Sequence, residues 1–133
     1  MSEMLANAPF QKIAKPKQRA IGCMDFFIQL FDNPATPKSC LVGTTIQEVS
    51  ETHPQLRSAA NQCFEHARGL FQGLLDEVCK AGRKRGVDTA SLADLWIATI
   101  QGSLILYKAS GDLSVIRKNL QHVKLYIAAQ LPE

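Results

Sequence analysis

The segment from Ser91 to Tyr107 constrains the fold of this chain more than any other. When it is wound as a helix, apolar residues fall on almost every side of it. A helix that is apolar nearly all round must be buried on more than one face. A chain of 133 residues has few helices with which to cover it. We therefore infer that one side of this helix packs on its own domain and another on a second subunit.

Two charged residues limit what else this segment can be. Asp94 and Lys108 bracket the apolar part too closely for the run of about 20 uncharged residues that a membrane span needs. Gly102 and Ser103 are small enough to let a neighbouring helix come close. The segment is thus predicted to be packed between protein surfaces and not to cross a membrane.

The totals are those of one ordinary domain. The hydrophobic fraction is 46%, and a net charge of +3 does not by itself argue for nucleic-acid binding. The first residues lack a basic segment followed by an apolar run, so we expect no signal peptide, a cytoplasmic location and reduced thiols. The four cysteines lack the spacing of zinc ligands and the three histidines are scattered. We therefore predict no metal and no cofactor.

Helical periodicity accounts for most of the chain, and no stretch alternates as a strand does. Helices are expected over 17–32, from about 41 to 50, 54–82, 89–110 and 113–130, after a weakly ordered segment at 1–16. Thr52 and Asp88 are predicted to cap two of them, and Gly111 to end the central one. The prediction is an all-α bundle of five to six helices in a single domain covering 1–133.

Two basic clusters interrupt this pattern. They contain Lys12, Lys15, Lys17 and Arg19 near the start, and Lys80, Arg83, Lys84 and Arg85 after the long helix. A solvated surface and the basic end of a helix are the ordinary interpretations, since cations suit a helix C-terminus. Contact with an anionic partner or with nucleic acid is the alternative.

Cys40 lies at or just before the first turn of the short helix. Free backbone N–H groups and the positive end of the helix favour a thiolate there, which could lower the pKa of the cysteine. A free cysteine is also often just a small buried apolar residue, and this alternative remains open. Cys23, Cys63 and Cys79 fall on or near apolar stripes and are expected in the core.

The order of these elements is similar to that of a known family. The motifs that carry the similarity are Ser39-Cys40-Leu41-Val42-Gly43, Glu48-Val49-Ser50-Glu51-Thr52, Pro54-Gln55-Leu56-Arg57, Ala93-Asp94-Leu95-Trp96, Gln101-Gly102-Ser103-Leu104 and Lys108-Ala109-Ser110-Gly111-Asp112. Together they resemble the C-terminal regulatory domain of TetR-family transcriptional repressors over roughly 17–130. The closest subgroup looks like the one that contains the N-ethylmaleimide-responsive repressor, which senses electrophiles.

One part of that family's pattern has no counterpart. Nothing in the chain resembles the family's N-terminal helix-turn-helix, so we expect an isolated ligand-binding and dimerisation domain. DNA would be bound only through a missing N-terminal domain. A natural short protein, a truncation and a proteolytic fragment all fit this expectation.

The resemblance implies a homodimer and a small-molecule effector. The helices at 89–110 and 113–130 would pair with their symmetry mates as a four-helix interface. Candidate interface residues are Leu95, Thr99, Gly102, Ile105, Ile116, Leu120, Val123 and Ile127. A pocket would lie between the helices at 17–32, 54–82 and 89–110, with Phe27, Phe31, Phe64, Phe71 and Trp96 as candidate walls, although plain core packing also explains these aromatic residues.

The resemblance also implies a sensing pair. Cys40 matches the sensing cysteine of the electrophile-responsive repressors, and Lys108 matches a lysine that can lie beside it. A nearby ammonium stabilises a thiolate. An adduct on Cys40 would shift the short helix and, in a full-length dimer, the DNA-reading heads.

Two other functions were weighed. A thiol-dependent enzyme would use Cys40 with His53 or His66 as its base, but no triad is readable and we predict no catalytic activity. The other alternative is a stand-alone protein that dimerises with a full-length repressor and antagonises it. This alternative rests only on the lack of a match to the family's DNA-binding helix-turn-helix.

Overall fold

The computed structural model describes residues 2–133, and these residues form helices without a strand. The elements are α1 (Ser2–Ala6), the short 3-10 helix η1 (Pro9–Lys12), α2 (Pro16–Asp32), α3 (Leu41–Val49), α4 (Pro54–Ala81), α5 (Thr89–Ser110) and α6 (Ser114–Gln130). The predicted all-α class is confirmed, and the five main helices begin and end within a few residues of their predicted bounds.

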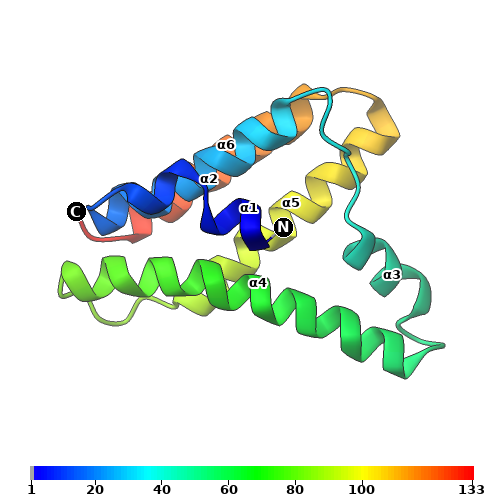
Figure 1. Cartoon of the computed structure of the whole chain (residues 1–133), viewed down its shortest axis with the longest axis horizontal. Coiled ribbons are helices and arrows are strands. Elements are labelled where there is room, and N and C mark those ends of the chain that lie inside the picture. The colour runs from blue at the N-terminus through cyan, green and yellow to red at the C-terminus, as the bar shows by residue number, and fades with distance from the viewer. Residues whose placement is uncertain (1) are drawn as a thin grey trace.

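Four long helices make the body of the molecule. α6 packs between α2 and α5, and α4 packs on both α2 and α5. α3 stands apart from this body, has its main contacts with α4, and lies at the end of the molecule opposite the C-terminus (Figure 1). The first half of α4 therefore extends beyond the bundle, and residues 54–59 are all exposed.

The centre of the core is filled by side chains from α2, α4 and α6. The largest of them, with essentially no exposed surface, are Met24, Leu75, Ile116, Leu120 and Ile127. α5 adds Trp96 and Leu104. Burial of a large apolar side chain contributes about 1.5–3 kcal/mol, so this cluster is the main source of stability.

Local signals fix the ends of α5. The carboxylate of Asp88 accepts a hydrogen bond from the Ser91 amide at 3.0 Å, as predicted for an N-cap. Gly111 ends the helix with φ of 72°, a left-handed conformation that glycine adopts without steric cost.

By length and composition α5 is apolar enough to span a membrane, as core helices of soluble proteins also are, but only 33% of its apolar window is buried. The part of this apolar window that is not buried within the subunit needs a further surface to pack against.

Two local predictions need correction. Residues 1–16 were expected to be weakly ordered, but Ala8 and Phe10 are buried and the Phe10 ring packs 5.8 Å from that of Phe26. The capping residue of α4 is His53, without a side-chain hydrogen bond, and not Thr52, whose hydroxyl lies 2.8 Å from His53 Nδ1 instead. Apolar contact with Phe26 orders the segment around Phe10, and the His53 ring engages the Thr52 hydroxyl that was expected to cap α4.

Leu75 and Leu70 on α4 provide a matched test of this packing. Leu75 is 0% exposed and Leu70 is 50% exposed. Leu75→Ala should lower the free energy of unfolding by about 2–5 kcal/mol because it leaves a cavity, and Leu70→Ala should lower it by less than about 1 kcal/mol. Urea denaturation followed by circular dichroism measures both. Equal losses would show that the bundle is packed differently.

Candidate functional site

A hollow of about 270 Å³ lies between α3 and α5. Its volume is just below the range of about 300–1,000 Å³ typical of pockets for drug-sized ligands, so it suits a small molecule. Half of its wall comes from α3 and half from α5. The lining residues are Cys40, Thr44, Gln47, Glu48, Gln101, Leu104, Ile105 and Lys108.

Cys40 caps the first turn of α3. Its backbone is extended and its sulfur accepts a hydrogen bond from the Gly43 amide at 3.4 Å. The predicted position of Cys40 at the start of the short helix is thus confirmed. The sulfur occupies the place where N-cap oxygens usually sit, next to amides that have no partner within the helix.

Gly43 allows α3 to approach α5 closely. Gly43 is buried, and a Cβ atom at this position would overlap Oε1 of Gln101. The Gln101 side chain therefore lies directly against the backbone of the first turn of α3. The same turn carries Cys40, so the position of the thiol depends on this contact.

The structure places Cys40 and Lys108 in the wall of one hollow, although 67 positions separate them in the sequence. Cys40 is half-buried and Lys108 is exposed. Lys108 forms no ion pair within residues 2–133. The two residues thus line the same small volume.

The other three cysteines have different surroundings. Burial raises the pKa of the Cys23 thiol to about 12. Burial also raises the pKa of Cys79, reinforced by the Asp76 carboxylate and opposed by the Lys84 ammonium. Cys63 was expected in the core but is exposed, because it lies on the part of α4 that extends beyond the bundle.

The predicted aromatic walls pack mainly against one another. Trp96 lies 6.3 Å from Phe27 and 5.8 Å from Phe71 between ring centroids, and Phe27 stacks on Phe31 at 6.4 Å. Phe64 is half-buried on α4. None of the five lines the hollow between α3 and α5. Their role as walls of a ligand cavity stays a prediction, and it requires these rings to separate.

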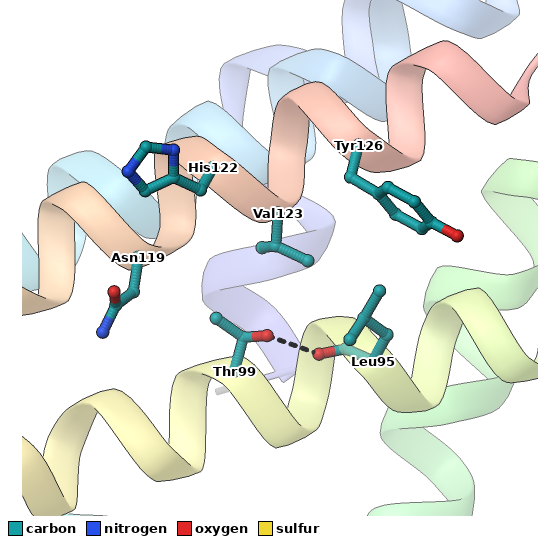
Figure 2. A pocket seen from close by; sticks show the side chains of 6 residues that line it. All are labelled: Leu95, Thr99, Asn119, His122, Val123 and Tyr126. Carbon is teal, nitrogen blue, oxygen red and sulfur yellow. Dashed lines mark hydrogen bonds between the residues drawn. The ribbon is translucent and has the colours of Figure 1, made fainter.

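A second, open groove runs along the outer surface between α5 and α6. Leu95 and Thr99 line it from α5, and Asn119, His122, Val123 and Tyr126 line it from α6 (Figure 2). The Thr99 hydroxyl donates to the Leu95 carbonyl at 2.7 Å and is satisfied within its own helix. The groove is therefore mainly apolar, with polar groups at its rim.

The predicted interface residues divide between this surface and the core. Leu95 and Ile105 are exposed, Thr99 and Gly102 are half-buried, and Ile105 faces the α3–α5 hollow. Val123 is buried at the floor of the groove. Ile116, Leu120 and Ile127 have no exposed surface, so a second subunit cannot touch them and their assignment to an interface is wrong.

The sequence analysis missed three exposed apolar residues on these helices. Leu106, Leu125 and Tyr126 are 52%, 66% and 53% exposed. On α6 the most regular apolar stripe serves the subunit's own core, and Leu125 and Tyr126 lie outside it. An apolar residue off the main stripe was the signal that could have identified them.

The histidines proposed as bases lie elsewhere. His53 precedes α4, beyond the end of α3 opposite Cys40, and His66 is exposed on α4. Neither lines the hollow that contains Cys40. Within the described part of the chain, no three His, Cys, Asp or Glu residues are grouped so that they could hold a metal ion.

The family model described as "Tetracyclin repressor-like, C-terminal domain" matches residues 16–123. No curated protein sequence matches the chain. A transcriptional regulator of the TetR family from Cytophaga hutchinsonii has a similar structure, with a TM-score of 0.77 and 15% identity over 98% of this chain and 66% of that one.

A TetR transcriptional regulator from Chloroflexus aurantiacus J-10-FL also has a TM-score of 0.77, with 22% identity over 99% of this chain and 75% of that one. At these identities the likeness shows the fold. The chain spans just under two thirds of the Cytophaga regulator's length and three quarters of the other's.

The contact between Gly43 and Gln101 can be tested by a double-mutant cycle. Gly43→Ala alone should not stabilise the protein, because the new methyl group must displace Gln101. In a Gln101→Ala background the same change should stabilise it by about 0.5–1 kcal/mol, since alanine favours a helix over glycine. Urea denaturation gives the four free energies. The same effect of Gly43→Ala in both backgrounds would exclude the contact.

Proposed function

Since this chain belongs to the family of tetracyclin repressor-like C-terminal domains, we propose that it is the dimerising and effector-sensing part of a transcriptional regulator. It would act in the cytoplasm without catalysing a reaction. Sequence-specific DNA recognition is assigned to a helix-turn-helix separate from the helices described here. The two similar regulators extend beyond the part that this chain matches, which fits that division.

The observation that carries the dimer is the exposed apolar surface on α5 and α6. Five of the nine large apolar residues exposed within the described chain lie on these two helices: Leu95, Ile105, Leu106, Leu125 and Tyr126. A monomer rarely leaves a large contiguous apolar surface in water. A second copy that packs the same helices about a two-fold axis covers such a surface with the commonest oligomeric symmetry.

The hollow between α3 and α5 is the proposed effector site. α3 has its main contacts with α4 and is not held firmly on α5, so a molecule in the hollow can change the separation of α3 from α5. α5 carries both the wall of this hollow and part of the proposed dimer surface. Effector binding and subunit packing would therefore be linked through one helix.

Electrophiles are the proposed class of effector. The Gly43 amide donates to the Cys40 sulfur, and Lys108 lines the same hollow, so an electrophile in the hollow would lie beside both the sulfur and a cationic side chain. Addition of the Cys40 thiol to an activated alkene such as a maleimide forms an S–C bond at the expense of the C=C π bond, transfers the thiol proton to the neighbouring carbon through solvent, and replaces a small thiol by a bulkier thioether. An adduct of this kind has to push the first turn of α3 away from Gln101.

Introduction of a charge on the outer face of α6 tests the dimer. Leu125→Glu should raise the dimer dissociation constant roughly 100-fold or more, since each copy would bury an unpaired carboxylate. Leu70→Glu, at an exposed leucine on α4, is the matched control and should leave the dimer intact. Light scattering coupled to size exclusion measures the mass. A wild-type monomer at tens of micromolar would contradict the proposal.

Alkylation rates test the sensing pair. Brief treatment with N-ethylmaleimide at pH 7, followed by peptide mass spectrometry, should label Cys40 faster than the exposed Cys63, which serves as an internal reference. Cys23 should stay unlabelled because burial keeps it protonated, with a pKa of about 12. Lys108→Gln should slow Cys40 roughly 3- to 10-fold because it removes the cationic side chain that shares the hollow with the sulfur, without affecting Cys63. If Cys40 reacts no faster than Cys63, the site binds effectors without thiol chemistry.

A further inference from the structure

Two basic segments that lie far apart in the sequence come together at one end of the molecule. Lys17 at the start of α2 pairs with Glu133 at 2.9 Å, and the Lys84 ammonium, just after α4, donates to the Gln130 carbonyl at 3.0 Å. Arg19 pairs with Glu77 near the end of α4 at 2.8 Å. The start of α2, the end of α4 and the end of α6 therefore meet (Figure 1). We call this region the basic end; its basic residues are Lys12, Lys15, Lys17, Arg19, Lys80, Arg83, Lys84 and Arg85.

The basic end carries the whole net positive charge of the protein. Its eight cations face four carboxylates, those of Asp76, Glu77, Asp88 and Glu133, which leaves a formal charge of +4 against +3 for the entire chain. The remainder of the molecule is thus slightly acidic. Such an uneven distribution produces a field that attracts polyanions to one end.

Most of these cations are free to meet a partner. Lys12, Lys15, Lys80, Arg83 and Arg85 are exposed, and within residues 2–133 none of the five makes an ion pair or a side-chain hydrogen bond. Two of the carboxylates are already engaged, because Asp76 accepts from the Thr89 hydroxyl and Asp88 caps α5. The local acids therefore do not neutralise the exposed cations.

Arg83 occupies a backbone position that normally belongs to glycine. The Lys84 amide bonds the Cys79 carbonyl at 2.9 Å and the Arg83 amide bonds the Lys80 carbonyl at 3.2 Å, a C-terminal motif whose left-handed residue is usually glycine. Here that residue is Arg83, with φ of 52°. Gly82 stands one position earlier, where a Cβ atom would overlap the Pro132 ring. Keeping a side chain at 83 costs conformational free energy, and such a cost often marks a functional residue.

We propose that the basic end binds the phosphate backbone of duplex nucleic acid independently of base sequence. The exposed large apolar residues of the described chain all lie elsewhere, so this end has nothing to insert into a lipid surface. It presents no exposed aromatic ring on which unpaired bases could stack. Neither of the two hollows described above is lined by its residues, so neither gives this end an enclosed site for a small anion. A row of phosphates along a duplex matches the feature that remains, which is a set of separate exposed cations.

The inference does not depend on Cys40 or on the proposed effector. It also differs from sequence-specific operator recognition, because contacts to phosphates carry no direct sequence information. If the alkylation experiment on Cys40 fails, the proposal for the basic end is unaffected. If the DNA titration fails, the proposed effector site is unaffected.

Salt dependence provides the test. The full chain is titrated against a fluorescein-labelled 25-base-pair DNA duplex of arbitrary sequence, by anisotropy, in KCl from 25 to 200 mM. The logarithm of the association constant should fall linearly with the logarithm of salt concentration, with a slope of about −4.5 if the five free cations each neutralise roughly one phosphate. A second duplex of unrelated sequence should give the same slope and affinity.

Point variants locate the contact. Lys80→Gln and Arg85→Gln should each reduce the magnitude of the slope by about one. Arg83→Gly should do the same while raising the melting temperature, because glycine relieves the left-handed backbone. Arg57→Gln removes one exposed cation at the opposite end of α4 and should change neither slope nor affinity.

Four results would overturn the proposal. They are an absence of duplex binding at 25 mM KCl, an equal loss of slope in Arg57→Gln, an unchanged slope in Arg83→Gly, and tighter binding to vesicles of anionic lipid than to the duplex. The last would identify the basic end as a membrane contact. Opposite shifts of stability and binding in Arg83→Gly would support the proposal most strongly, since loss of structure cannot produce them.

Discussion

The need to bury α5 on two sides determines the rest of this structure. One side, with Trp96 and Leu104, packs into the subunit. Another, with Leu95 and Leu106, reaches the surface, where Leu95 lines a groove with Tyr126 of α6, and its apolar area remains in water within one subunit. Water penalises exposed apolar area at about 25 cal/mol per Å², so this surface favours association over a free monomer.

The same helix separates a rigid part of the molecule from a looser one. Toward α2, α4 and α6 its neighbours are tightly packed, whereas toward α3 it borders the hollow that contains Cys40 and Lys108. α3 meets it closely where Gln101 lies over Gly43. Under the proposed function, a small molecule that enters there would change this contact, and dense packing would pass a displacement of α5 to its other side.

Helical periodicity and capping residues predicted the class, the helices and the position of Cys40, because these depend on neighbours in the sequence. Periodicity also identified the apolar stripe of α6, but it could not tell core from interface: Ile116, Leu120 and Ile127 serve the core, and the outer surface belongs to Leu125 and Tyr126. Three other features depend on how far the helices extend past one another. They are the exposure of Cys63, the burial of Phe10 and the meeting of the two basic segments. Tertiary geometry sets these properties, and no local pattern records them.

The central claim is that a second copy covers the outer faces of α5 and α6. Hydroxyl-radical footprinting of the native protein at about 50 μM tests it without any substitution. Leu70 and Leu125 are 50% and 66% exposed within one subunit. The account predicts that Leu125 and Tyr126 are protected from oxidation relative to Leu70 and lose this protection on dilution. Oxidation of Leu125 at least as fast as that of Leu70 at every concentration would contradict it.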